Sequence, residues 1–180
     1  QGGDPGEVLL TGVMEISPDG HFAIMQRNTI TVLLDVEKGS YVELPQQLQR
    51  AAFSKKRDVA YALTPDYRVV ALDLATATEL WSVAPFSDVS LLKVNDDDSS
   101  LVVVEGSTAN VIDPEKGVVR ASAELPTSAS FGSFLPKSNR IAIAGHTSWN
   151  AHQPATPIAL LDLEAGQVVS VDVPNCEAPL

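Results

Sequence analysis

The chain has 180 residues, of which 44% are hydrophobic and 19% charged, a composition that suits a globular protein rather than a disordered one. Twelve basic and 23 acidic side chains give a net charge of −11, which repels phosphate backbones and anionic membrane surfaces and argues against nucleic-acid binding. No stretch approaches the roughly 18 apolar residues of a membrane-spanning helix, so the sequence predicts no transmembrane segment.

From the N-terminus onward, short apolar runs alternate with polar turns in four similar units. Each unit holds an inner run, a polar turn, an apolar run, a second turn, a run ending in Asp, and a final run. The polar turns read SPDG, SKKRD, NDDDSS and PKSN, and the apolar runs after them read FAIM, VAYAL, LVVV and IAIA. This alternation of apolar runs and polar turns predicts four antiparallel strands per unit. We place the units at residues 8–45, 46–85, 86–126 and 127–174, with a tail or the start of a missing unit at 175–180.

The units share one motif at the end of the third run, which reads LDVEKG, LDLATA, IDPEKG and LDLEAG. Its aspartates follow one another at intervals of 38, 40 and 49 residues. A period of about 40 residues with several strands per repeat is typical of a β-propeller blade, which buries its faces against its neighbours. We therefore predict an all-β fold. Four four-stranded antiparallel blades would belong to a β-propeller of seven or eight blades in all.

The aspartate and glycine of the motif are predicted to shape the hairpin between the third and fourth strands. An Asp at a strand end accepts a hydrogen bond from a backbone N–H two residues on, and Gly adopts positive φ at little steric cost. A set of carboxylate ligands is the alternative, but propeller turns usually face solvent. The predicted turn residues are Asp35, Asp73, Asp113, Asp162, Gly39, Gly117 and Gly166.

The second unit carries a family resemblance. Its segment ALDLATATELW is similar to the repeat of quinoprotein-type propellers, which favours Ala, Asp, Thr, Gly and Trp at set spacings. The residues that fit are Ala71, Asp73, Thr76 and Trp81, while Ala77 stands where that repeat prefers Gly. In the other units the position of Trp81 is held by Glu43, Ala121 and Ser170. The resemblance implies that Trp81 lies on the outer strand of its blade, in the core between neighbouring blades. The SPDG turn of the first unit is equally common in WD-repeat and lactonase-like propellers.

The resemblance leaves two classes of function open, because one propeller architecture hosts enzymes, ligand binders and scaffolds. Quinoprotein dehydrogenases hold a quinone and a calcium ion over the channel, whereas non-catalytic members include bacterial envelope lipoproteins that help assemble outer-membrane proteins. We predict a non-catalytic scaffold that binds a protein or peptide partner through its loop face, without a cofactor, catalytic residues or a metal. The alternative is part of a propeller enzyme, either a quinoprotein-like oxidoreductase or a lactonase-like hydrolase.

The fourth unit departs from the repeat through a long connection, GHTSWNAHQPATP, between its second and third strands. In propellers this connection lies on the face that surrounds the channel mouth. An aromatic side chain on such a loop is a plausible anchor for a partner. Two histidines six residues apart are not a specific metal-ligand spacing, so partner contact or packing onto its own blade is favoured over metal binding. The predicted binding residues are Trp149, His146, His152 and Asn150.

Two charged turns complete the candidates. The basic run Lys55 to Arg57 and the acidic run Asp96 to Asp98 are both interpreted as solvated hairpin tips. Oxygen clusters can bind calcium, but three consecutive aspartates lack the alternating spacing and the Gly of a calcium loop. We therefore expect no ligand at either turn.

Four blades allow three ways of closing a propeller ring: the chain is half of a longer protein, one half of a two-chain propeller, or a small closed ring. We favour an incomplete ring, in which further blades are needed for closure. The single cysteine, Cys176, cannot form a disulfide within the chain and is interpreted as an inert thiol or a bridge to a segment elsewhere. The polar start QGGDPG and the high use of Ala, Val and Asp suggest an exported bacterial protein, periplasmic or at the cell surface, with the cytoplasm as alternative.

Overall fold

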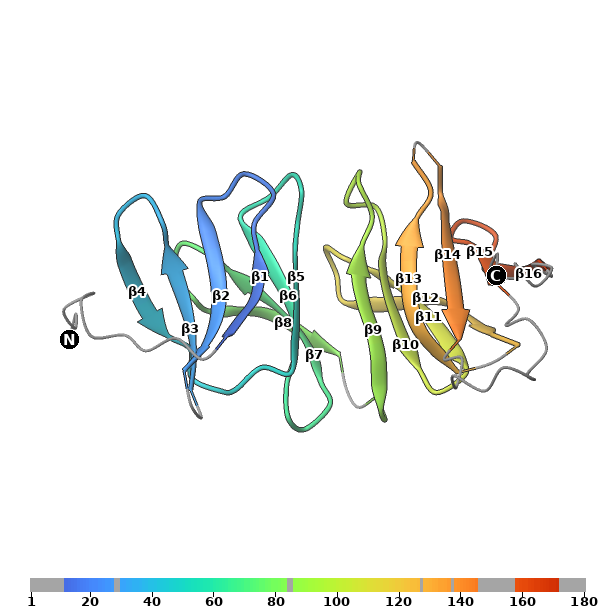
Figure 1. Ribbon diagram of the computed structural model, residues 1–180, viewed down its shortest axis with the longest axis horizontal. Helices are drawn as coiled ribbons and strands as arrows, with labels where there is room; N and C mark the ends of the chain where they lie inside the picture. The colour runs from blue at the N-terminus through green and yellow to red at the C-terminus, as the bar shows by residue number, and fades with distance from the viewer. Residues whose placement is uncertain are drawn as a thin grey trace, which may run out of the picture.

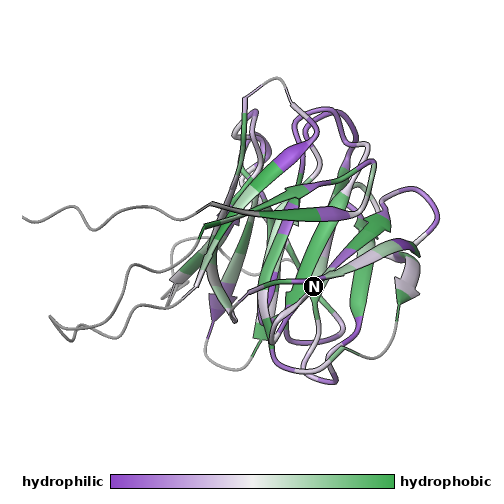
Figure 2. Ribbon diagram, turned by 90° about the vertical axis from the view of Figure 1, so that its right-hand side faces the viewer, coloured by the Kyte–Doolittle hydropathy of each residue, from purple (hydrophilic) through white to green (hydrophobic). Residues whose placement is uncertain are grey.

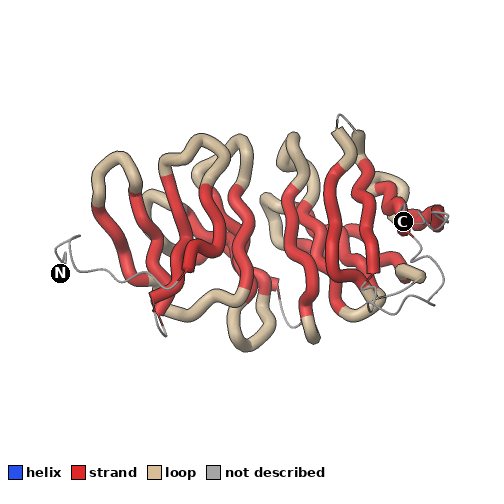
Figure 3. The backbone as a smooth tube through the Cα atoms, in the orientation of Figure 1, coloured by secondary structure: helices blue, strands red, loops and turns tan. Residues whose placement is uncertain are grey.

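The structure is a computed structural model that describes residues 12–27, 30–83, 86–126, 128–136, 138–145 and 158–171. Across these ranges the backbone forms strands joined by turns and short loops, with no helix (Figure 3). No helix long and apolar enough to cross a membrane occurs in this described part of the chain.

Sixteen described strands form four antiparallel sheets of four strands each, and within every sheet the strands follow their order in the sequence. Sheet 1 holds β1 (Gly12–Ile16), β2 (Phe22–Arg27), β3 (Ile30–Asp35) and β4 (Ser40–Glu43). Sheet 2 holds β5 (Arg50–Phe53), β6 (Val59–Leu63), β7 (Val69–Asp73) and β8 (Glu79–Val83). Sheet 3 holds β9 (Val89–Val94), β10 (Leu101–Glu105), β11 (Thr108–Asp113) and β12 (Val118–Glu124). Sheet 4 holds β13 (Ala129–Phe134), β14 (Arg140–Gly145), β15 (Ile158–Asp162) and β16 (Gln167–Val171).

The four sheets stand side by side in a row, with sheets 1 and 4 at opposite ends (Figure 1). The innermost strands contact one another in sequence order, β1 against β5, β5 against β9, and β9 against β13. The predicted all-β fold with four four-stranded antiparallel blades is therefore confirmed.

The hydrophobic core lies in the junctions between neighbouring sheets, because successive side chains of a strand point to opposite faces. The second and third strands of the middle sheets are apolar at almost every position; in β10, for instance, all four residues from Leu101 to Val104 are fully buried. Their two faces serve two junctions. Leu101 and Val103 pack toward sheet 2, while Val102 and Val104 pack toward sheet 4. Seen from the sheet 4 end, hydrophobic residues colour much of the strands and polar residues gather in the turns (Figure 2).

The fourth strands differ in register between the middle and the terminal sheets. In sheets 2 and 3 a β-bulge in the outer strand places Trp81 across from Ala71 and Ala121 across from Val111. Sheets 1 and 4 have regular pairing there, so the residues that occupy the position of Trp81 are Val42 and Val169. The sequence alignment that placed Glu43 and Ser170 at this position was wrong by one residue, because the bulge adds one residue to the outer strand of the middle sheets.

Candidate functional site

The innermost strands of the four sheets line a groove with a volume of about 630 Å³. The groove extends along these strands, from Pro18, Lys55 and Asp96 in the polar turns to Gln49 and Arg50 at the start of β5. Its other lining residues are Met14, Glu15, Ile16, Gln26, Ala51, Ala52, Phe53, Leu91, Leu92, Lys93, Val94, Ser133 and Phe134. Sequence analysis missed the groove because it is assembled from short segments of four separate units.

Charged side chains on the groove wall are arranged in local pairs. Burial raises the pKa of Glu15 above its usual value, although the nearby Lys93 ammonium acts in the opposite direction. Lys55 forms an ion pair with Asp96 at the rim of the groove. The Nε of Arg50 donates a hydrogen bond to the Val89 carbonyl, 3.1 Å away, which ties β5 to β9 beneath the groove.

The apolar and charged residues of the groove together suit the binding of another molecule. The volume falls in the range of about 300 to 1,000 Å³ that is usual for ligand sites. Apolar residues such as Ile16 and Phe134 line it beside the cationic Lys93 and the carboxyl of Glu15. Such a surface can accept an extended peptide or a protruding loop, burying apolar groups while the charged wall residues fix its direction.

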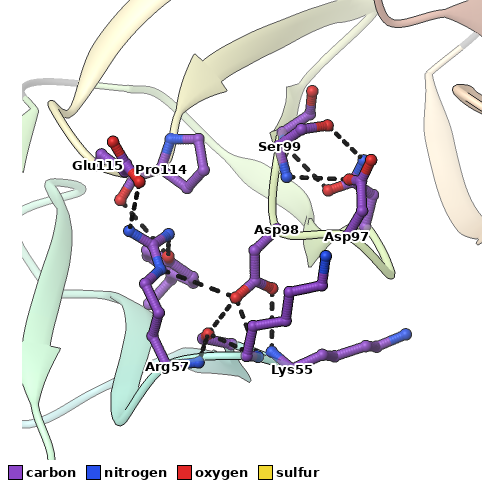
Figure 4. A network of polar contacts seen from close by, with 12 residues as sticks. Lys55, Arg57, Asp97, Asp98, Ser99, Pro114 and Glu115 are labelled. Atoms are coloured by element: carbon purple, nitrogen blue, oxygen red, sulfur yellow. Dashed lines mark hydrogen bonds and ion pairs between the residues drawn. The ribbon is translucent and has the colours of Figure 1, made fainter.

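A buried carboxylate lies in the junction between sheets 2 and 3, where it contacts Lys55, a residue that also lines the groove (Figure 4). Asp98 is 8% exposed and accepts hydrogen bonds from the backbone N–H groups of Lys55 at 2.9 Å and Lys56 at 3.1 Å. The hydroxyl of Ser54 also donates to it. The interpretation of the acidic run as a solvated tip is wrong for Asp98. The backbone of Asp98, which lies in a turn of sheet 3, has a φ of 58°. Its side chain contacts the backbone of a turn in sheet 2.

The same junction contains a second polar cluster around the Pro114 carbonyl (Figure 4). The indole Nε1 of Trp81 donates to this oxygen at 3.2 Å, and the Tyr61 hydroxyl donates to it at 3.4 Å. Arg57 links the two clusters, because its Nη2 donates to the Tyr61 hydroxyl at 2.7 Å and its Nε lies 3.8 Å from Asp98. Burial raises the pKa of Tyr61 to about 12, so this hydroxyl keeps its proton and remains a donor at neutral pH.

Trp81, for which the resemblance implied a core position, is partly buried and packs against the core of this junction. Its ring lies 5.9 Å from that of Tyr61, centroid to centroid, at a tilt of 32°. Gly117 of the neighbouring sheet lies directly against it, since a Cβ at Gly117 would come within 2.6 Å of the indole Cε3.

The repeated aspartates each accept backbone N–H groups within their own turn. Asp35 accepts from Lys38 at 2.9 Å and Asp73 from Thr76 at 2.8 Å. Asp113 accepts from Glu115 at 2.9 Å and Asp162 from Ala165 at 3.0 Å. Hydrogen bonds hold the pKa of Asp35, Asp73 and Asp162 below the usual value. The hydrogen bonds that lower the pKa most come from the Lys38 side chain, the Thr76 hydroxyl and the Ala165 backbone N–H, respectively.

The turn glycines have the left-handed conformation that favours glycine. The φ angles are 60° at Gly39, 66° at Gly117 and 62° at Gly166. Ala77, which replaces Gly in sheet 2, has a similar φ of 56° and packs against the core between sheets 1 and 2.

The predicted binding residues His146, Trp149, Asn150 and His152 lie outside the described residues. Within the described ranges, no three His, Cys, Asp or Glu side chains are grouped so that they could hold a metal ion.

No family model matches the chain, and no curated protein matches its sequence. Several solved structures share its fold. A chain of the mitotic checkpoint complex crystal structure superposes with a TM-score of 0.71 at 17% identity, covering 91% of this chain and 51% of its own length. A chain of hydrazine synthase from Kuenenia stuttgartiensis gives 0.73 at 16% identity, with coverages of 94% and 52%. BamB from Moraxella catarrhalis gives 0.65 at 14% identity, with coverages of 93% and 54%.

These similarities, together with the four sheets, define the class: the chain is a propeller-repeat protein. It spans about half the length of each of the three solved chains. At such low identity the likeness concerns the fold alone, and one propeller architecture hosts unrelated functions.

Proposed function

We propose that this protein is a non-catalytic scaffold that binds a protein or peptide partner in the groove of its innermost strands and on the adjoining loops. The observation that carries the proposal is the groove itself, which combines a volume of about 630 Å³ with apolar and charged side chains from all four sheets. Because the groove is built on strands, its geometry is fixed by the sheet junctions behind it.

The chemistry of the wall supports a peptide-like ligand. Lys93 is exposed and lies near the carboxyl of Glu15, so the groove presents a cation and an acid side by side. A polypeptide segment with charged and apolar side chains can satisfy both kinds of surface. The long loop between β14 and β15 is the second part of the proposed contact surface, because Trp149 offers an aromatic anchor there.

The test is a selection of peptides from a random displayed library against the full chain, followed by titration calorimetry of the peptides obtained. We expect Lys93→Glu to lower the affinity for the selected peptide by about tenfold or more, since this substitution reverses a charge inside the groove. Lys116→Glu makes the same charge change at an exposed turn away from the groove and is expected to leave the affinity within about twofold.

Two outcomes would contradict the groove proposal. One is a failure to select any peptide, and the other is binding that responds equally to both substitutions. Trp149→Ala tests the loop separately: an affinity unchanged by this substitution would remove the loop from the contact surface.

A further inference from the structure

The groove of the innermost strands carries more cations than acids, although the chain as a whole is acidic. Its basic wall residues are Arg50, Lys55 and Lys93, and its acidic wall residues are Glu15 and Asp96. The whole chain has 12 basic and 23 acidic side chains. The excess of positive charge in the groove is therefore a local feature, opposite in sign to the net charge of the chain.

Ion pairing leaves two of the three groove cations available to a ligand. Lys55 pairs with Asp96, whereas neither Arg50 nor Lys93 forms an ion pair with any residue that the structure describes. The Nε of Arg50 donates to the Val89 carbonyl, which holds the guanidinium beside the start of β9, and its terminal nitrogens donate to no described residue. Both Arg50 and Lys93 are exposed, so their charges are accessible in the groove.

Glu15 offsets at most one of these two charges. Its carboxyl belongs to β1 and the Lys93 ammonium to β9, with β5 between the two strands in the row. Burial raises the pKa of Glu15 more than the Lys93 ammonium lowers it, so the lysine compensates this carboxyl only in part. A basic ligand would meet one carboxylate and two cations at this wall, whereas an acidic ligand would meet two cations and one carboxylate. The charge balance therefore favours an acidic ligand.

The two available cations lie at different levels along the groove. Arg50 is held at the level of Val89, and Lys93 follows Val89 by four residues in the same strand. A strand rises by about 3.3 Å per residue and the β-bulge at Ser90 shortens this stretch, so the two levels are about 10 to 13 Å apart. Side chains on one face of an extended peptide recur about every 7 Å. Acidic side chains two to four residues apart in such a peptide can therefore reach both cations.

We propose that the groove binds an acidic, extended peptide segment, whose carboxylates pair with Arg50 and Lys93 while its apolar side chains contact residues such as Ile16 and Phe134. This inference rests on the proposed function and specifies its ligand. Ile16 is 55% exposed, so apolar surface is accessible beside the charges. The net charge of the chain opposes the approach of an acidic segment. At physiological ionic strength, however, exposed charges more than about 8 Å apart are largely screened, so the nearby cations dominate once the segment is in the groove.

The composition of peptides selected from the random displayed library against the full chain gives the first test. We expect an excess of Asp and Glu over Lys and Arg, relative to the unselected library. A failure to select any peptide would contradict the proposed function and this inference together. Selected peptides without an acidic excess would overturn this inference alone and leave the proposed function intact.

Substitutions of the charged wall residues give the second test, by titration calorimetry with the tightest selected peptide. Lys93→Gln and Arg50→Gln should each lower the affinity about threefold, as expected for the loss of one exposed ion pair. Arg50→Lys keeps the charge and should restore most of the affinity. Glu15→Gln removes the opposing carboxylate and should raise the affinity about threefold. Circular dichroism checks that every variant is folded.

Glu43→Gln is the matched control for the Glu15 substitution. It makes the same change at an exposed residue of the outer strand β4, outside the groove, and should leave the affinity unchanged. The inference would be overturned if the affinity stayed the same in both Lys93→Gln and Arg50→Gln. A loss of affinity in Glu15→Gln would also overturn it, because the carboxylate would then attract the ligand instead of opposing it.

Discussion

Two junctions of the same repeat are filled in different ways. The central junction, between sheets 2 and 3, contains the indole of Trp81 and the phenol ring of Tyr61. The distal junction, between sheets 3 and 4, has Ala121 at the position of Trp81. There Gly166 approaches so closely that an added Cβ would lie 2.9 Å from the Ala121 Cβ.

The polar turns differ in the same direction. At the central junction Asp98 extends to the turn of the preceding sheet and accepts hydrogen bonds from its backbone. The equivalent residue of sheet 4 is Ser138, whose hydroxyl donates to Leu135 in its own turn, 3.0 Å away. Junctions of the same repeat thus contain either a large aromatic side chain or a close approach of small residues. In the central junction the aromatic side chain is accompanied by the hydrogen bonds of Asp98 to the preceding sheet, which we call the polar latch.

The largest expected effect on stability is that of Trp81→Ala. This substitution removes the indole from the central junction and leaves the Pro114 carbonyl without one of its two donors. We expect a loss of about 3 kcal/mol in the free energy of unfolding, measured by urea denaturation. Leu80→Ala, at the exposed neighbouring residue, should change it by less than about 0.5 kcal/mol. Equal losses of stability from the two substitutions would contradict the placement of Trp81 in the central junction.

A second prediction separates backbone strain from close packing. Gly39 and Gly117 have similar φ angles, but a Cβ at Gly39 meets nothing within 4 Å, whereas one at Gly117 would overlap the Trp81 ring. Gly39→Ala should therefore cost about 1 kcal/mol from the left-handed backbone alone. Gly117→Ala should cost about 2 to 3 kcal/mol, because the indole must also move. If thermal or chemical denaturation gave the same loss for both, the indole would not lie against Gly117.

The third prediction concerns the polar latch. Asp98→Ala leaves the backbone N–H groups of Lys55 and Lys56 without their carboxylate acceptor and should destabilise the protein by about 2 kcal/mol. Asp97→Ala alters the preceding, exposed residue of the same acidic run and should have less than half that effect. A larger loss for Asp97→Ala would show that the wrong aspartate has been assigned to the junction.

The smallest effect is a dependence of stability on pH. The pKa values of Asp35, Asp73 and Asp162 are lowered in the folded chain, so folding is favoured by their ionised forms. This contribution is fully present above the pKa of the unfolded chain, near pH 4, and is lost as the pH falls through the lower folded values. Urea midpoints should therefore decline below about pH 4. Replacing these three residues with Asn should flatten the decline, and an unchanged slope would contradict the assignment.

The strands, the repeat and the Asp-containing hairpins could be predicted, because their signals are local. Alternating apolar runs and turn residues specify each sheet without reference to its neighbours. The latch could not be predicted in this way. Asp98 is one of three consecutive aspartates, and its partners lie more than 40 residues earlier, in another sheet. Nothing local distinguishes it from Asp97.

The groove and the outer-strand register show the same limit. A bulge shifts Trp81 and Ala121 by one residue relative to Val42 and Val169, and nothing in the spacing of the motif reveals it. The groove combines residues such as Glu15 and Lys93 that only the packing of four sheets brings near each other. Contacts between repeats, rather than within them, were therefore beyond the sequence pattern.

Amide hydrogen exchange, followed strand by strand, tests most directly the claim that the large aromatic side chains and the Asp98 latch distinguish the central junction from the distal one. We predict the slowest exchange in β6, β7, β10 and β11, with rates set by global unfolding. The strands β14 and β15 of the distal junction should exchange earlier, and Trp81→Ala should remove this difference. If β14 and β15 were instead protected as strongly as β6 and β7, the large aromatic side chain and the polar latch would not be what distinguishes the two junctions.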